Sequence, residues 1–536
     1  MKVNFKKIFI YTLLIVFLIP SCNYLNLEPE DEVTRDKFWK TKEEVESAVM
    51  GCYAAMMNYD AMLRYFLWGE IRADLVVTTV RANEALINIK NGDLSPTDGF
   101  NAWGSIYAVI NNCNTVLEFA KETKKIDQSF SEDLLLQYEA EVTAIRSLMY
   151  FYLVRTFGDV PYITEASLSD SQNYSVPKST QKEIIEELIK SLKSIDRTQN
   201  GTNKGIPFGY GTNPAANKGR FTVWGVKALL ADIYLWNEDY EKCISETNQI
   251  INSGQFSLVQ IKSNLENVDF NGEVRTVYYP SEADADIFFT SMYVNGNSVE
   301  SIFELQFSTD YENPFYDYFS SRTGRIAANT EVLSNLELFM PSSVDKGWYD
   351  TRGEGVSFRQ GLIWKWIGLN RSSATTRVQG ESFSNWIFYR LADVYLMKAE
   401  ALNQLGKSGN TAQLEESLAI VRKIRERATA PESTDLIPST SLQIDPQILE
   451  EFILKERARE FAHEGKRWFD VLRNAKRDNY AGINHLIVLA TYSTTPDKVL
   501  GLQNKWKGDF NSHYSPIDLE ELRANSALVQ NPFYLK

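Results

Sequence analysis

The stretch LKERAREFAHEGKRWFDVLR, Leu454 to Arg473, combines acidic, basic and aromatic residues at helical spacing. Opposite charges three residues apart share one face of a helix, as in the pairs Glu456–Arg459, Arg457–Glu460 and Glu464–Arg467. Large apolar residues would anchor the stretch to its neighbours; they are Phe461, Trp468, Phe469 and Leu472. Gly465 weakens the helix near its centre, which predicts a bend or a close helix contact.

The same stretch raises the question of an active site, because His463 stands beside Glu464. The chain has only three histidines, and the other two, His485 and His513, are distant in sequence. No second histidine or cysteine lies at ligand spacing from His463. The residues therefore give little support to metal binding or histidine catalysis, and the sequence predicts neither a metal nor a cofactor.

Helices dominate the parts of the sequence with a clear pattern. Thr41 with Glu44, and Thr180 with Glu183, each form a capping box ahead of apolar residues at helical spacing. Between them, residues 140–156 predict a long helix that ends at Gly158, ahead of Pro161.

Two stretches predict helical hairpins of tetratricopeptide type. They are TVWGVKALLADIYLWNEDYEKCISETNQII, residues 222–251, and residues 388–428, in which small residues on one helix allow the partner helix to approach closely. Residues 254–385 are irregular and rich in aromatic residues, with a strand-like run over 301–307, and residues 197–220 and 429–447 are long loops. The predicted fold is mainly α: a tetratricopeptide-like hairpin scaffold that carries a large irregular loop lobe with a few short strands.

The bulk composition narrows the function classes. The chain of 536 residues has a formal net charge of −14, so no basic excess exists to neutralise phosphates, and nucleic acid is disfavoured as a partner. Three cysteines follow position 22, Cys52, Cys113 and Cys243, each within a helical pattern. An odd number without paired spacing predicts buried free thiols rather than a disulfide framework.

The N-terminus differs from the rest of the chain. Three lysines precede an apolar run from Ile8 to Ile19, which predicts a secretory signal over residues 1–21 that is too short to span a bilayer. Ser21-Cys22 resembles the lipobox of bacterial lipoproteins, although Ile19 stands where leucine is usual. Cys22 is therefore the expected lipidation site and first mature residue, and plain secretion is the alternative.

Five segments together resemble the SusD/RagB family of outer-membrane lipoproteins. They are the lipobox, LNLEPEDEVTRDKFWKTKEEVESAVMGCY, AIRSLMYFYLVRTFGDVPYI, FYRLADVYLMKAEALNQLG with LKERAREFAHEGKRWFDVLR, and the ending ALVQNPFYLK. They follow the family's order over nearly the whole chain, although Phe533 replaces the glycine of the usual terminal asparagine-proline-glycine.

The resemblance implies one body over residues 22–536, with four tetratricopeptide-like units and a variable ligand lobe that we place at roughly 254–385. It also implies an oligosaccharide ligand, a lipid anchor facing the cell surface, and a TonB-dependent outer-membrane transporter that the protein covers as a hinged lid. No catalytic activity is implied. Because the family signature lies in the quoted stretch while family ligands vary, we interpret that stretch as a brace between helices.

Sugar sites combine aromatic platforms with planar polar side chains that engage adjacent hydroxyls. Two regions of the chain, 72–103 and 278–325, supply this mixture, and the family's aromatic platforms fall in the same two regions. The candidate ligand residues are Asp74, Arg81, Asn83, Asn101, Trp103, Tyr279, Tyr293, Phe315 and Tyr316. Trp103 begins an amphipathic helix, so a core position is an equal alternative for it.

Other functions remain open at this point. A RagB-like member of the same family would take peptides with the same transporter partnership. A glycosidase would need two carboxylates, and with 70 Asp and Glu residues chance pairs are common, but no acid or nucleophile motif stands out. A tetratricopeptide adaptor would bind protein alone.

Overall fold

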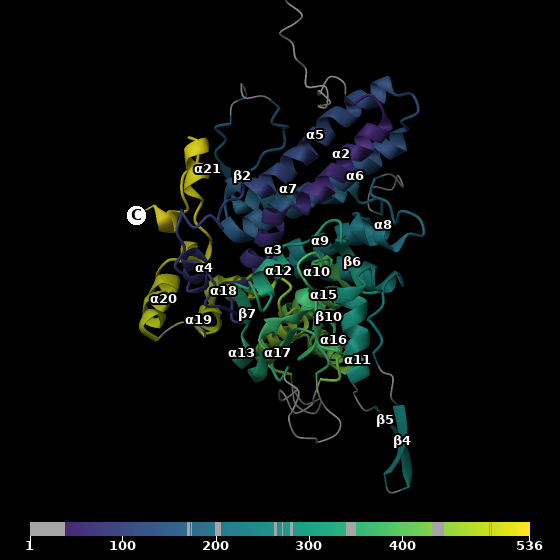
Figure 1. The fold of residues 1–536 in the computed structure, drawn as a ribbon, viewed down its shortest axis with the longest axis vertical. Coiled ribbons are helices and arrows are strands. Elements are labelled where there is room, and N and C mark those ends of the chain that lie inside the picture. The colour runs from purple at the N-terminus through teal and green to yellow at the C-terminus, as the bar shows by residue number, and fades with distance from the viewer. Residues whose placement is uncertain are drawn as a thin grey trace, which may run out of the picture.

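The computed structural model describes residues 38–168, 172, 174–198, 205–261, 265–270, 272–278, 282–338, 350–430, 444–492, 494 and 496–535. The signal, the lipobox and Cys22 lie outside these residues. As predicted, the described chain is mainly helical with a few short strands (Figure 1). None of its helices combines the length and apolar character that a membrane span requires.

A bundle of N-terminal helices occupies one end of the molecule (Figure 1). The bundle consists of α2 (Lys42–Met56), α5 (Gly104–Ile126), α6 (Glu132–Phe157) and α7 (Gln181–Ile195), whereas α3 (Tyr59–Glu70) and α4 (Glu84–Lys90) lie nearer the middle of the molecule. Both predicted capping boxes are present, at Thr41 and Thr180. Helix α6 begins earlier than predicted, because the Ser131 side chain caps it by accepting from the Leu134 N–H, and it ends at Gly158 with φ of 75°.

The two predicted hairpins are confirmed and pack on one another. The first consists of α9 (Val223–Trp236) and α10 (Tyr240–Asn252), and the second of α15 (Leu391–Gly406) and α16 (Thr411–Arg427), with α10 packed against α15. Helix α8 (Pro214–Gly219) lies in the first predicted loop. The remaining C-terminal helices are α17 (Pro446–Glu460), α18 (Arg467–Tyr480), α19 (Ile483–Thr491), α20 (Pro496–Gly508) and α21 (Leu519–Ala524).

The middle of the chain contains short elements, as predicted for the irregular lobe. Its helices are α11 (Glu282–Phe289), α12 (Phe315–Phe319), α13 (Thr330–Asn335) and α14 (Trp364–Ile367), with a π-helix at Thr290–Val294. Every strand pair is antiparallel: β1 (Val76–Thr78) with β7 (Ile326–Ala328), β2 (Val160–Pro161) with β3 (Lys178–Ser179), β4 (Leu265–Phe270) with β5 (Glu273–Tyr278), β6 (Ser301–Leu305) with β12 (Trp386–Arg390), β8 (Phe358–Arg359) with β9 (Leu362–Ile363), and β10 (Gly368–Asn370) with β11 (Thr375–Thr376). The β4–β5 ribbon projects from the body (Figure 1).

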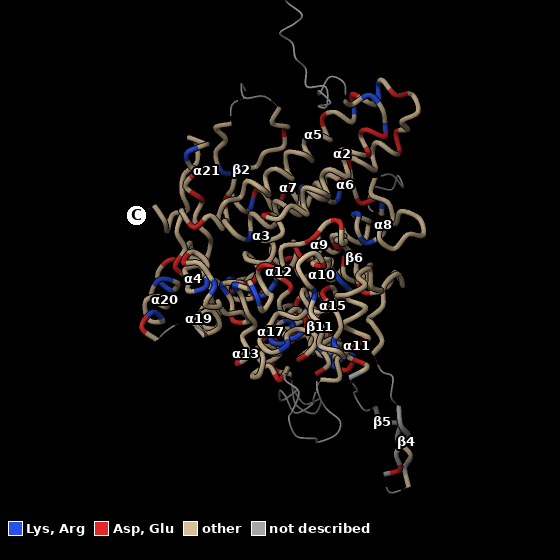
Figure 2. The backbone as a smooth tube through the Cα atoms, in the orientation of Figure 1, with Lys and Arg blue, Asp and Glu red and all other residues tan. Residues whose placement is uncertain are grey.

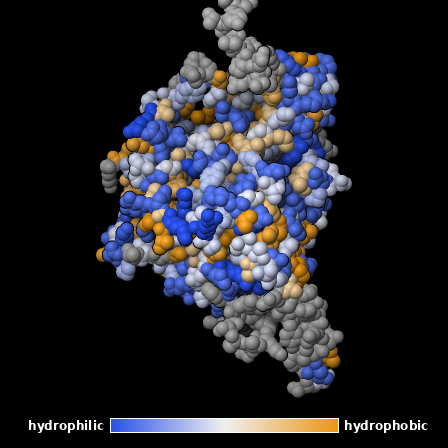
Figure 3. Space-filling view, in the orientation of Figure 1, coloured by the Kyte–Doolittle hydropathy of each residue, from blue (hydrophilic) through white to orange (hydrophobic). Residues whose placement is uncertain are grey.

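Apolar side chains fill the interior between these elements, including the free thiols predicted at Cys52, Cys113 and Cys243. Charged residues of both signs also gather inside, around α17 and α18 (Figure 2). By contrast, the face in Figure 3 is largely hydrophilic with smaller hydrophobic areas. Polar contacts also join distant parts of the sequence. For example, the Arg72 guanidinium donates to the carbonyl of His513, 441 positions away, at 2.6 Å.

The quoted stretch forms two helices with a tight turn between them. Helix α17 ends at Glu460, α18 begins at Arg467, and Gly465 adopts a φ of 68° in the turn. A Cβ built at Gly69 of α3 would lie 1.7 Å from the Gly465 carbonyl oxygen, so the two backbones are in direct contact. The close contact predicted at Gly465 is confirmed, but in place of a bent helix the chain forms two helices separated by a turn.

We expect Gly69→Ala to lower the free energy of unfolding by about 1–3 kcal/mol, because the new methyl group meets backbone rather than a side chain that can move. Gly51→Ala is the matched control, since a Cβ at this helical position meets no atom within 4 Å. The control is expected to raise stability by about 0.5–1 kcal/mol. Urea denaturation of both variants tests the contact, and equal effects of the two substitutions would contradict it.

Candidate ligand-binding surface

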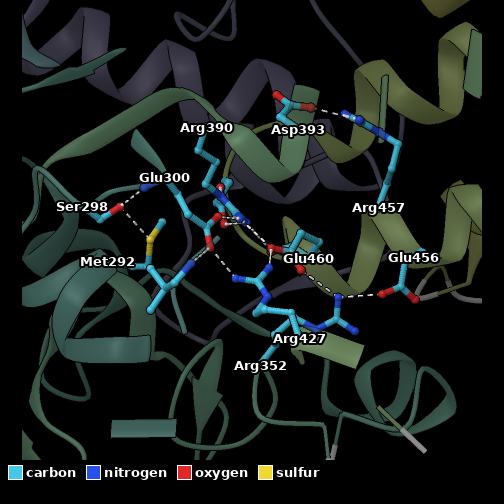
Figure 4. Close-up of polar contacts among 12 residues, drawn as sticks. Met292, Ser298, Glu300, Arg352, Arg390, Asp393, Arg427, Glu456, Arg457 and Glu460 are labelled. Carbon is cyan, nitrogen blue, oxygen red and sulfur yellow. Dashed lines mark hydrogen bonds and ion pairs between the residues drawn. The ribbon is translucent and has the colours of Figure 1, made fainter. Parts of the chain in front are cut away.

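The charges of the quoted stretch form a buried ion network (Figure 4). We define this network as Glu300, Arg352, Lys365, Arg390, Arg425, Arg427, Glu456, Arg459, Glu460 and Glu464. Glu460 accepts from Arg390 at 2.5 Å, from Arg352 at 2.8 Å and from Arg427. Glu300 pairs with Arg427 at 2.6 Å and with Arg390 at 3.3 Å. The network thus joins β12, α16 and α17 to the irregular lobe.

The network lowers the pKa values of Glu456, Glu460 and Glu464. Burial alone would raise the pKa of Glu456, but the guanidinium groups of Arg352, Arg459 and Arg425 lower it to about 2. Burial likewise opposes ionisation of Glu464, yet Arg390 and Lys365 lower its pKa to about 2. These carboxylates are therefore charged and fully engaged at neutral pH, as expected of a structural brace.

His463 is held in the interior as well. Its two ring nitrogens lie 3.2 Å from the carbonyl oxygens of Ser357 and Leu75, and burial lowers its pKa to about 4. The imidazole is therefore neutral at physiological pH and faces backbone on both sides. This geometry places it in the brace and supports the interpretation of the stretch as scaffold.

Of the three charge pairs predicted in this stretch, only Glu456–Arg459 forms, at 3.1 Å. Arg457 pairs instead with Asp393 and Asp470, each at 2.9 Å. Glu464 and Arg467 lie on opposite sides of the turn at Gly465, so helical spacing does not apply to them. The prediction assumed one continuous helix, and the turn makes it wrong for Glu464 and Arg467. Arg457 and Glu460 both lie in α17, but each pairs with residues from other segments instead.

The β1–β7 pair brings the two candidate regions together. Val76 is opposite Ala328 and Thr78 is opposite Ile326, while the Thr79 N–H donates to the Arg325 carbonyl at 2.9 Å. The Thr79 hydroxyl also donates to the Gly324 carbonyl at 2.7 Å. Segments about 250 positions apart, one following β1 and the other following α12, therefore lie side by side.

Exposed and half-buried polar and aromatic side chains surround this junction. We call Tyr59, Arg81, Tyr316, Asp317 and Arg325 the β1–α12 surface. Tyr59 is 47% exposed, and its hydroxyl donates to the Asp317 carboxylate at 3.3 Å. The Arg325 guanidinium lies 5.2 Å from the ring centre of the neighbouring Tyr318. The junction thus combines an exposed aromatic side chain with a carboxylate and guanidinium groups, the mixture expected of a sugar site.

Four predicted ligand residues lie in the interior instead. Asp74 forms a bidentate ion pair with Arg467 at 2.8 and 2.9 Å, and Asn101 donates to the Ser95 carbonyl at 3.0 Å. The Tyr293 hydroxyl donates to Glu464 at 3.0 Å, and Phe315 packs among aromatic rings. The partners of Asp74 and Tyr293 come from distant parts of the chain, whereas that of Asn101 is local. Burial removes all four side chains from the candidate surface.

The other predicted residues are divided among several places. Arg81 and Asn83 are exposed beside β1, where the Asn83 side chain caps α4 by accepting from the Leu86 N–H. Tyr316 is half-buried on the β1–α12 surface. Trp103 is only 3% exposed at the start of α5, and Tyr279 lies outside the described residues.

Comparison with known proteins agrees with this architecture. A SusD family profile matches residues 300–534, and a second profile, described as "Starch-binding associating with outer membrane", matches residues 23–235. The chain belongs to the SusD family. The family resemblance predicted from the sequence is therefore confirmed, and the two matches include both sides of the β1–α12 surface.

Individual SusD-like proteins are similar over nearly their full length. SusD-like protein P38 of Formosa agariphila is 26% identical over 503 residues, which cover 88% of this chain and 92% of that protein. A SusD-like protein of Bacteroides ovatus is 23% identical, covering 94% of this chain and 85% of its own. A crystal structure of a SusD superfamily protein from Bacteroides vulgatus superposes with a TM-score of 0.68 at 20% identity, covering 93% of this chain and all of that one. This last match establishes the fold.

Proposed function

We propose that this protein is a glycan-binding lipoprotein of the outer-membrane surface, which captures oligosaccharides and delivers them to a TonB-dependent transporter. The observation that carries the proposal is the β1–α12 surface, where two distant regions join into one exposed area of tyrosine, carboxylate and guanidinium groups. The profile over residues 23–235 supports a carbohydrate ligand and an outer-membrane location. Lipid attached to Cys22 would hold the protein at the membrane.

The proposed capture relies on several weak contacts. A sugar ring would stack its C–H face on Tyr59, while Asp317 and the guanidinium groups would engage its hydroxyls. Such sites give affinities in the micromolar to millimolar range, about −4 to −8 kcal/mol. Closure of the protein over the transporter as a hinged lid would then retain the weakly bound glycan during delivery.

We expect Tyr59→Ala to weaken glycan binding about tenfold, because the substitution removes an exposed aromatic platform. Tyr492→Ala is the matched control: this tyrosine is 39% exposed, and its hydroxyl donates to Glu331 at 3.1 Å, a contact like that of Tyr59 with Asp317 but between residues outside the β1–α12 surface. Calorimetry would use the mature chain with Cys22→Ser and a panel of plant, host and microbial glycans plus a peptide mixture.

The panel separates the alternatives. Glycan binding that is lost in the Tyr59 variant and kept in the Tyr492 variant would support the proposal and locate the site. Binding of peptides alone would favour a RagB-like function with the same transporter partnership. Equal loss in both variants would remove the β1–α12 surface as the site.

A further inference from the structure

A hollow that shares no residue with the β1–α12 surface lies at the start of α5. Its volume is about 340 Å³, within the range of roughly 300–1,000 Å³ that is typical of small-molecule sites. It is lined by the first turns of α5, by Pro161, Ile163, Ser167 and Tyr174, and by α21 with the residues that follow it. Helix α21 stands beside the β2 end of the N-terminal bundle (Figure 1). Three aromatic residues contribute to the wall: Trp103, Tyr107 and Tyr174.

Most polar side chains of this hollow already have protein partners. Asn111 exchanges two hydrogen bonds with the backbone of Ser167, at 2.7 and 3.3 Å. The Tyr107 hydroxyl donates to the Pro161 carbonyl at 2.7 Å, and Asn525 donates to the Val176 carbonyl at 2.8 Å. These groups fix the shape of the hollow and have little capacity left to select a ligand.

Glu521 of α21 adds a carboxylate to the wall, where it accepts hydrogen bonds from the Trp103 indole and from the backbone N–H groups of Trp103 and Gly104. No lysine or arginine of the described chain forms an ion pair with its carboxylate, and the nearest basic residue along its own helix, Arg523, pairs with Glu520 at 2.5 Å. Partial burial raises the pKa of Glu521, and the charge of Asp518 adds to this effect, whereas the indole of Trp103 and the N–H groups at the start of α5 lower it. The hollow thus presents a carboxylate without a cation beside aromatic rings.

We propose that this hollow binds a ligand bearing an organic ammonium group. The Glu521 carboxylate carries the charge opposite to that of the ammonium group, and the faces of Trp and Tyr rings attract cations. An anionic ligand is disfavoured by Glu521, and a neutral ligand would gain no charge–charge attraction from it. Tyr174, which is 43% exposed, lies at the rim of the hollow, where a ligand would enter. The proposal is independent of the glycan surface, because the two sites share no residue.

The ammonium group could belong to an amino sugar or to a lysine side chain, and two probe pairs separate these sources. Calorimetry on the mature chain with Cys22→Ser would compare glucosamine with N-acetylglucosamine, and lysine amide with its Nζ-acetylated form with the α-amine blocked in both. We expect at least one ammonium probe to bind about tenfold more tightly than its acetylated partner. The pair that shows the difference identifies the source.

Glu521→Gln is expected to abolish this preference, and Tyr174→Ala to weaken binding of the ammonium probe. The control is Glu520→Gln, which changes an exposed glutamate of the same helix that does not line the hollow. Tyr59→Ala should leave ammonium binding unchanged, so this proposal and the glycan proposal can fail separately. Equal binding of charged and acetylated probes, no binding of either ammonium probe, or an unchanged preference in Glu521→Gln would overturn the proposal.

Discussion

Arg390→Ala is expected to lower the free energy of unfolding by about 3–5 kcal/mol, the usual cost of removing one partner from a buried ion pair. The side chain of Arg390 is fully buried and donates to Glu460 at 2.5 Å and to Glu464 at 3.0 and 3.1 Å. Its removal leaves three carboxylates in the interior, including Glu300, with one cation fewer. Urea denaturation, which leaves ionic strength unchanged, would measure the loss.

Arg523→Ala provides the matched control for this prediction. Arg523 also pairs with a glutamate at 2.5 Å, but both side chains are exposed on α21. Surface pairs contribute about 0–1 kcal/mol, so the control should hardly change the urea midpoint. A loss in Arg390→Ala no larger than in Arg523→Ala would show that the buried network does not brace the fold.

Acidification should destabilise the protein steeply between about pH 4.5 and pH 2. Glu456, Glu464 and Asp393 have folded pKa values of about 2, below their ordinary values of 4.5, 4.5 and 3.8. A depressed pKa stabilises the folded state above the ordinary value, and this stability is lost as pH falls through the folded value. Each glutamate contributes roughly 3 kcal/mol at neutral pH. Urea midpoints measured from pH 7 to pH 2.5 test this dependence.

Glu70 has the opposite effect on the pH dependence of stability, so its contribution must be separated from the loss of stability at acidic pH. Burial raises its pKa to about 8, so its contribution is present below pH 4.5 and is lost as pH rises toward 8. The Glu70→Gln variant removes this contribution and should leave the loss of stability below pH 4.5 unchanged. If stability falls as much below pH 4.5 in Arg390→Ala as in the unchanged protein, the buried network is not the source of that loss.

Much of the scaffold could be predicted from local patterns. The capping boxes at Thr41 and Thr180 and both hairpins depend on residues within a few positions of each other, so the sequence displays them directly. The pairing of Asp74 with Arg467 spans 393 positions and leaves no local trace. An aspartate that looks exposed in sequence therefore proved to be buried, and the same cause misplaced Tyr293.

The sequence predicted the regions of the candidate site better than its individual residues. The juxtaposition of residues 72–103 and 278–325 depends on the β1–β7 pairing, which composition cannot reveal. Tyr59 and Tyr174 were missed, although each stands beside asparagine in a polar context, which favours exposure of the ring. Applying that criterion to the whole chain would have found both. Glu521 carried no such signal among 70 acidic residues.

The hydrogen bond between Arg72 and the His513 carbonyl also affects the order in which the protein folds. A chain that is made N-terminus first exposes α3 and β1 long before residues 467 and 513 emerge. Until then, the partners of Arg72 and Asp74 are missing, and non-local contacts of this kind slow folding. An almost complete chain must therefore remain unfinished, and the closing step of folding belongs to its last seventy or so residues.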